Sequence, residues 1–316
     1  MNTPTRLTAF ALVLGLALGG GALVGNAAGP ISAGDDEMDE HGSDAGTPAA
    51  APADTTEATD MPAGVLIAQD GYTLDADTTA LDPGAPGPFR FRILGPDGTP
   101  VEDFEVSHEK ELHLIVVGTD LATYAHLHPT MGDDGSWSVE LPALAPGVHR
   151  TYADFAVADG PELTLGIDLT VAGEARFASL PEPDATAEVD GYEVTLTGSP
   201  VAGASSDLTL TVRRDGEPMT DVEPYLGAFG HLVAIRSGDL AYLHVHPHGD
   251  EVTDADARGG PEVAFAVEIP SAGAYRLFFD FQHDGQVHTA AFTVDVAADG
   301  SAQPGSPAHD DEEGHG

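Results

Sequence analysis

The stretch LHLIVVGTDLATYAHLHP (residues 112–129) and its diverged copy GHLVAIRSGDLAYLHVHP (residues 230–247) decide the fold of this chain. In each copy, two apolar runs rich in β-branched residues flank a turn signal, Gly118-Thr119-Asp120 in the first and Ser237-Gly238-Asp239 in the second. Apolar β-branched runs on either side of such a turn are typical of a β-hairpin. Both copies therefore predict a pair of antiparallel strands.

The duplication extends beyond the two hairpins. Gly71-Tyr72 begins one unit and Gly191-Tyr192 begins the other, and the turns Asp97-Gly98 and Asp215-Gly216 each start sixteen residues before the first histidine of the hairpin. Each unit holds roughly seven or eight short alternating segments separated by Gly, Pro and Asp turns, without a helical period, as in a β-sandwich of about 100 residues. We therefore predict an all-β chain of two tandem immunoglobulin-like or cupredoxin-like β-sandwiches.

The ends of the chain differ from these units in composition. Residues 1–28 combine a single arginine with a run rich in Ala, Leu and Gly, which is typical of a signal peptide; an uncleaved N-terminal membrane anchor is the alternative. Residues 29–63 and 298–316 are acidic and poor in large apolar side chains, so we expect a disordered linker and a disordered tail that contains histidines. The sandwiches are expected over 64–178 and 184–297, in an extracytoplasmic protein that is secreted or associated with the cell envelope.

Charge and composition exclude several classes of partner and site. The formal net charge is −42, so no basic patch is available to neutralise the phosphates of a nucleic acid. The chain has no cysteine, which excludes thiolate metal sites, cysteine nucleophiles and lipid attachment at cysteine. A membrane is a partner only if the N-terminal segment is retained as an anchor.

A histidine pattern recurs at matched places in the two hairpins. In each copy a histidine is followed thirteen positions later by His-x-His-Pro, which gives the set His113, His126, His128, His231, His244 and His246. With the turn centred on its Gly-Asp segment, the first two histidines of each set are expected opposite each other, and the third shares their face because strand residues alternate. Imidazole is a preferred ligand of zinc and copper, so each set predicts a Cu(II) or Zn(II) site.

Further side chains are candidates for completing these sites. The first unit adds His108 and His149, and the second adds His248 directly after its motif together with His283 and His288 on its last hairpin. The second unit therefore has the larger set of candidate ligands, and we expect it to be the better binder.

Two aspartates also stand at matched positions. Asp154 follows Arg150 by four residues, and Asp280 follows Arg276 by four. A salt bridge with the arginine is the simplest interpretation of each aspartate. The alternative is that the aspartate accepts a hydrogen bond from the outer nitrogen of a ligand histidine, as is usual behind imidazole ligands.

The two faces of each hairpin have different expected surroundings. The face opposite the histidines should be buried; it carries Leu114, Val116, Leu127, Leu232, Leu243 and Val245. The histidine face is itself partly apolar, since it carries Ile115, Val117 and Tyr124. Part of that face must therefore also be covered. We expect Trp137 and Phe265 to lie in the sandwich cores.

The favoured function is that of an exported protein that binds copper or zinc for sequestration or delivery. The alternative is a non-catalytic scaffold or interaction protein of the cell envelope, with structural histidines and another envelope protein as partner. We expect no enzyme, because the sequence has no nucleophile elbow, P-loop or dinucleotide fingerprint. Catalysis by a zinc ion held by three histidines would also need an acid/base residue, and the residue spacing identifies none.

The strings KELHLIVV, HLHPT, RTYADF and LGAFGHLVAIRSGDLAYLHVHP resemble a group of secreted actinobacterial tandem β-sandwich proteins. They are more loosely similar to YtkA-like and copper-resistance extracytoplasmic domains. The resemblance covers about residues 71–297 and implies export, a sandwich fold and a role in handling copper or another heavy metal. The copper-resistance pattern has a histidine at the mature N-terminus that this chain lacks, so that family's ligand set does not carry over directly.

Overall fold

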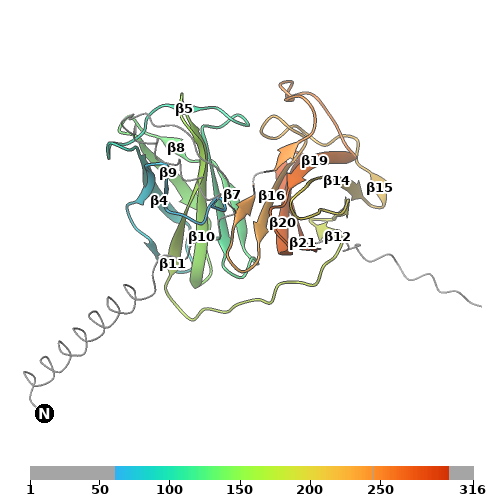
Figure 1. Cartoon of the computed structure of the whole chain (residues 1–316). Helices are drawn as coiled ribbons and strands as arrows, with labels where there is room; N and C mark the ends of the chain where they lie inside the picture. The colour runs from blue at the N-terminus through green and yellow to red at the C-terminus, as the bar shows by residue number, and fades with distance from the viewer. Residues whose placement is uncertain (1–60, 244, 299–316) are drawn as a thin grey trace, which may run out of the picture. The chain divides into compact units, whose positions relative to one another are not determined.

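The structure is a computed structural model and describes residues 61–243 and 245–298 (Figure 1). The expected signal peptide, nearly all of the acidic linker and residues 299–316 of the tail lie outside the described residues. Every regular element of the described part is a β-strand. Within it, no helix has the length and apolar character needed to span a membrane.

The first repeat is built from two sheets. Its strands are β1 (Ala68–Gln69), β2 (Tyr72–Ala76), β3 (Ala80–Leu81), β4 (Gly87–Leu94), β5 (Phe104–Glu105), β6 (Leu112–Gly118), β7 (Tyr124–Leu127), β8 (Thr130–Met131), β9 (Ser136–Leu141), β10 (Gly147–Val157) and β11 (Glu162–Val171). One sheet has the order β1-β2-β4-β9-β8, and the other has the order β3-β11-β10-β6-β7, with β5 paired to β10.

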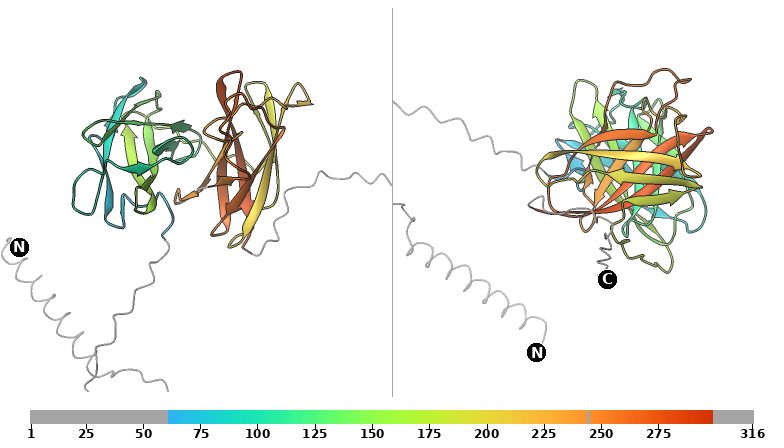
Figure 2. Two further views of the ribbon diagram at one scale, coloured as in Figure 1. Left: turned by 90° about the horizontal axis from the view of Figure 1, so that it is seen from above. Right: turned by 90° about the vertical axis from the view of Figure 1, so that its right-hand side faces the viewer.

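The second repeat has the same plan (Figures 1 and 2). Its strands are β12 (Thr186–Val189), β13 (Tyr192–Thr197), β14 (Ser205–Arg214), β15 (Glu217–Pro218), β16 (His231–Arg236), β17 (Tyr242–Leu243), β18 (His246–Pro247), β19 (Glu262–Glu268), β20 (Gly273–His283) and β21 (Gln286–Val296). The sheets run β12-β13-β14-β19-β18, with β15 on β14, and β17-β16-β20-β21. The predicted all-β class with tandem sandwiches is confirmed.

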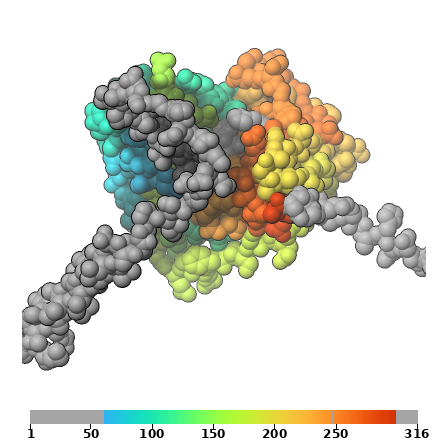
Figure 3. Space-filling model, viewed as in Figure 1, coloured from blue at the N-terminus to red at the C-terminus, as the bar shows by residue number. Residues whose placement is uncertain are grey.

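Alternation of apolar and polar residues fills a core inside each repeat. In β4 the side chains of Phe89, Phe91 and Ile93 are fully buried, whereas the intervening arginines point outward. Trp137 and Phe265, on the matched strands β9 and β19, lie in the two cores as predicted. The segment 172–185 that connects the repeats is exposed and forms no strand, and it is the yellow-green stretch in Figure 3.

Strand β6 is buried on both of its faces. Leu114 and Val116 point into the first core, while Ile115 and Val117, on the histidine face, belong to a separate apolar cluster. That cluster joins the repeats, since β16 and β20 contribute Val233, Ile235 and Phe278 to it. The histidine face of each repeat is therefore covered by the histidine face of the other repeat.

Specific contacts fix the two faces against each other. The rings of Tyr124 and Phe278 stack with centroids 4.2 Å apart. The buried Tyr152 hydroxyl donates to the carbonyl of Leu240 at 2.7 Å, so its hydrogen bond is satisfied across the interface. Apolar packing and directional bonds together define one arrangement of the repeats.

The predicted register of both hairpins is wrong by two residues. His126 pairs with Ile115 and not with His113, and in the second hairpin the pairing of Tyr242 with Ile235 shows the same offset. The predicted face survives, because a shift of two residues keeps every side chain on the same side of a strand.

The cause of this shift is a longer connection than the expected turn. Strand β6 ends at Gly118 and β7 begins at Tyr124. The loop between them is closed by a hydrogen bond from the Gly118 N–H to the Thr123 carbonyl at 3.0 Å. Leu121 within it, like its counterpart Leu240, has a left-handed backbone with φ of 58°. Leucine gives no sequence signal for that conformation.

Truncation of Ile115 tests the packing of the repeats. Ile115 is 0% exposed, as is Ile93 inside the first core. Replacing either residue with alanine should therefore lower the free energy of unfolding by about 2–5 kcal/mol in denaturant titrations. Ile67→Ala, at a 49% exposed position, should change it by less than about 0.5 kcal/mol. If Ile115→Ala behaves like Ile67→Ala, the repeats do not cover each other.

Candidate metal centre

Three histidines of the first repeat converge at the end of one hairpin. His113 is the second residue of β6, His126 lies in β7, and His128 follows β7. Their ring centroids are separated by 5.3 Å (His113–His126), 5.2 Å (His113–His128) and 4.9 Å (His126–His128). Each ring offers one nitrogen such that these atoms all lie within 4.8 Å of one another.

The outer nitrogen of two of these rings is held by an acceptor. The backbone carbonyl of Ser107 lies 3.0 Å from His113 Nε2, and the carboxylate of Asp280 lies 3.0 Å from His126 Nδ1. A carbonyl or a carboxylate only accepts, so both of these ring nitrogens carry the proton. The remaining nitrogens, His113 Nδ1 and His126 Nε2, then face each other at 3.1 Å.

Burial keeps the imidazoles of His113 and His128 neutral. It lowers the pKa of His113 to about 4, with the neighbouring His126 as a further cause. It lowers the pKa of His128 to about 3, again with His126 contributing. His113 Nδ1 therefore presents a lone pair toward His126 Nε2. His128 Nε2 is buried without a hydrogen-bond partner among the described residues. These three imidazole nitrogens together form a candidate site for a cation.

The spacing of these nitrogens suits a transition-metal ion. Two nitrogens at about 2.0–2.1 Å from a tetrahedral zinc ion are roughly 3.3 Å apart, and the centroids of their rings are about 5 Å apart. The observed nitrogen separation of 3.1 Å and centroid separations of 4.9–5.3 Å are close to these values. Such a set of three leaves one coordination position for another ligand.

Asp280 belongs to the second repeat but accepts hydrogen bonds from side chains of the first. Its Oδ2 accepts from His126 Nδ1 at 3.0 Å and from the Tyr124 hydroxyl at 3.1 Å, and its Oδ1 accepts from Thr289 at 2.6 Å. The side chain is 2% exposed. Three donors thus compensate the buried carboxylate.

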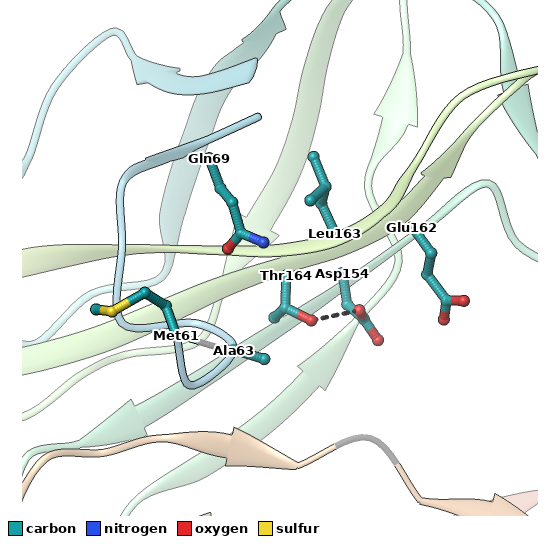
Figure 4. A pocket seen from close by; sticks show the side chains of 7 residues that line it. All are labelled: Met61, Ala63, Gln69, Asp154, Glu162, Leu163 and Thr164. Atoms are coloured by element: carbon teal, nitrogen blue, oxygen red, sulfur yellow. Dashed lines mark hydrogen bonds between the residues drawn. The ribbon is translucent and has the colours of Figure 1, made fainter. Parts of the chain in front are cut away.

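The predicted salt bridges between matched arginines and aspartates are wrong. Arg150 pairs with Asp168 at 2.9 Å, and Arg276 donates to Thr293. Asp154 instead accepts from Thr164 at 2.8 Å (Figure 4) and from Tyr242 of the second repeat at 3.3 Å. The reason is the cross-repeat packing, which brings tyrosines to both aspartates. The cavity of about 230 Å³ beside Asp154 in Figure 4 is lined by no histidine.

The additional histidines of the second repeat lie away from this site. His248 is exposed and lies 3.2 Å from Asp207. His283 shares the core-facing side of β20 with Phe281, whereas Asp280 faces the first repeat. His288 pairs opposite Phe281, so it lies on that same side and contacts Asp190. The predicted role of His283 and His288 beside His231 is wrong, because strand alternation points them to the other face.

The second predicted set is described only in part. His231 is the first residue of β16, is buried and pairs opposite Asp280. His244 lies outside the described residues, and so does the side chain of His246, whose backbone pairs with Ala266. The grouping of His231, His244 and His246 therefore stays a prediction, as does the expectation that the second set binds better.

Several functional residues were not predicted from the sequence. Tyr124 shares the face of His126, so strand alternation alone could have placed it there. The Ser107 carbonyl and the side chain of Tyr225, whose ring lies 6.2 Å from that of His128, come from loops without a sequence signal. His108, by contrast, is one of the predicted additional candidates, and its ring lies 6.2 Å from that of His113.

Comparisons with known proteins identify a family and distant structural neighbours. Residues 67–173 and 187–298 match, once in each repeat, the family model described as "Domain of unknown function (DUF8832)". No curated protein matches the chain.

The similar solved structures include an adhesin, an integrin-binding protein and an S-layer protein. An Escherichia coli adhesin, FdeC, is 14% identical over 73% of this chain and 65% of its own, with a TM-score of 0.24. Invasin, a bacterial integrin-binding protein, is 13% identical over 72% and 39%, with a TM-score of 0.22. Domains 4 and 5 of the S-layer protein SbsC are 9% identical over 74% and 100%, with a TM-score of 0.21. This chain spans less than two thirds of the length of the first two.

The lowered histidine pKa values predict how stability depends on pH. The unfolded chain takes up a proton at the ordinary histidine pKa of 6.5, whereas folded His113 takes it up only at about 4. The free energy of unfolding of the metal-free protein should therefore fall as the pH drops from 6.5 to 4, by on the order of 3 kcal/mol from His113 alone.

Replacement of His113 isolates this contribution from that of the carboxylates. His113→Gln should reduce the slope of unfolding free energy against pH between 6.5 and 5 by up to about 1.4 kcal/mol per pH unit. Chemical denaturation at a series of pH values provides the measurement. Equal slopes in both proteins would mean that His113 is already solvated in the folded state.

Proposed function

We propose that this chain, which belongs to the family described as "Domain of unknown function (DUF8832)", is an extracytoplasmic protein that binds Cu(II) or Zn(II) without catalysis. The ligands are His113, His126 and His128 of the first repeat. Asp280 of the second repeat orients His126. The role is sequestration or delivery of the ion outside the cytoplasm, which agrees with the resemblance to copper-resistance domains.

One observation carries the proposal. His113 Nδ1 and His126 Nε2 face each other at 3.1 Å although both outer nitrogens are committed as donors. A divalent cation between these two nitrogens would bond to both, while each outer nitrogen keeps its own hydrogen bond. Imidazole ligands without thiolate or thioether suit Cu(II) and Zn(II) better than Cu(I).

A structural role for the histidines is the second candidate. The bond from His126 to Asp280 and that from Tyr242 to Asp154 both join the repeats without any ion. They belong to the same interface as the apolar cluster around Ile115 and Ile235. On this interpretation the chain is a rigid two-sandwich scaffold of the cell envelope, and loss of the histidines lowers the melting temperature of the metal-free protein.

Calorimetric titration of the metal-free protein with Cu(II) and with Zn(II) separates the two candidates. The variant with His113, His126 and His128 all changed to alanine should lose one bound ion per chain relative to the wild type. A matched control changes three other histidines, His248, His309 and His315, to alanine and should retain that ion. Equal stoichiometry and affinity in all three proteins would eliminate the metal site and leave the structural role.

Replacement of Asp280 tests how the site is oriented. Asp280→Asn removes the carboxylate that fixes the Nδ1–H tautomer of His126, so the affinity for the ion should fall by about 10–100-fold. Asp168→Asn, at a 51% exposed side chain on the sheet of His113, serves as the control and should leave the affinity unchanged. Competition with a chromophoric chelator measures both. An unaltered affinity in Asp280→Asn would show that His126 is not a ligand.

A further inference from the structure

A small cavity collects histidines from both repeats. Its volume is about 30 Å³, which is the share of one water molecule in liquid water. Its lining includes four imidazoles, those of His108, His113, His126 and His231. His113 and His126 belong to the ligand set described above, whereas His108 and His231 have no role in it.

His231 repeats the local geometry of His113. The carbonyl of Tyr225 lies 2.8 Å from His231 Nε2, just as the carbonyl of Ser107 lies 3.0 Å from His113 Nε2. In both cases the carbonyl belongs to the residue six positions earlier. His231 Nε2 therefore carries the proton, and its Nδ1 is left with a lone pair, as in His113.

The rings of His108 and His231 are spaced like rings that share an ion. Their centroids are 5.1 Å apart, within the range of 4.9–5.3 Å found in the first set. His231 is farther from His126, at 6.4 Å, and His108 is 6.2 Å from His113. These longer separations place His231 beside the first ion and not on it as a fourth ligand.

We propose that His108 and His231 hold a second transition-metal ion next to the first, so that the two positions form one binuclear centre across the repeats. The inference rests on the proposed function, because the first ion occupies the set of His113, His126 and His128. The cavity that these four imidazoles line has the volume of one water molecule. Each repeat supplies one imidazole to the second position.

Access to this centre is provided by His108. The same residue lines two outer cavities of about 360 Å³ and 670 Å³. Glu105, Glu111 and Glu162 line the smaller one and outnumber its one lysine, Lys110. Glu109 and Glu251 line the larger. Acidic walls raise the local concentration of cations, so divalent ions are drawn toward His108.

Electron paramagnetic resonance of the full chain loaded with Cu(II) tests the proposal. Neighbouring Cu(II) ions couple magnetically, so the doubly loaded wild type should show a broadened spectrum and a half-field signal. His108→Ala should bind one ion fewer and give the unbroadened spectrum of an isolated Cu(II) with imidazole ligands. His248→Ala is the control and should retain the coupled spectrum.

The outcomes separate this inference from the proposed function. If the wild type shows only uncoupled ions, or if His108→Ala keeps the coupled spectrum, the binuclear centre is excluded while the first site stands. If the alanine variant of His113, His126 and His128 binds as many ions as the wild type, the proposed function itself fails. His108→Gln is the second variant; it keeps a side chain of similar size should alanine destabilise the loop, and it should give the same loss of one ion.

Discussion

The hydrogen bond between His126 of the first repeat and Asp280 of the second is the constraint on which the site depends. It fixes the proton of His126 on Nδ1, so that Nε2 points at His113 Nδ1. It also ties a ligand to the opposite sandwich, because the carboxylate is held in place by Thr289 within its own repeat. The geometry of the three histidines is therefore set by the packing of the two repeats and not by one hairpin alone.

The apolar cluster between the repeats determines the electrostatics of that site. Ile115, Val117 and Tyr124 alternate with core residues along the same strands and exclude water from the histidine face. Removal of water disfavours the charged imidazolium, which lowers the pKa of His113 to about 4. Neutral imidazoles keep their lone pairs available, and a metal ion at this cluster would compete with protons for the same nitrogens.

The sequence was sufficient for the strands and their faces. Alternation predicted that Leu114, Val116 and Leu232 point into the cores, and they are buried there. The predicted register of the two hairpins was wrong because Leu121 and Leu240 adopt a left-handed backbone. Leucine gives no sequence signal for that conformation. The role of Asp280 also could not be predicted from the sequence. It depends on which faces of two sandwiches meet, and that choice is made by contacts between residues about 150 positions apart, such as His126 and Asp280 (|i−j| = 154).

Duplication explains why a site of this kind forms at the contact between the repeats. When two copies of one face pack together, every contact forms twice, as in an isologous dimer. If residue A of the first copy contacts residue B of the second, then residue B of the first copy contacts residue A of the second. Tyr124 with Asp280 and Tyr242 with Asp154 are such a reciprocal pair. Residues near the local two-fold axis are brought close to their own copies, which is how His231 comes to line the cavity of His113. A histidine on that face of a single ancestral domain would thus be present twice near the axis after duplication. The histidine cluster and the docking of the repeats then depend on the same contacts.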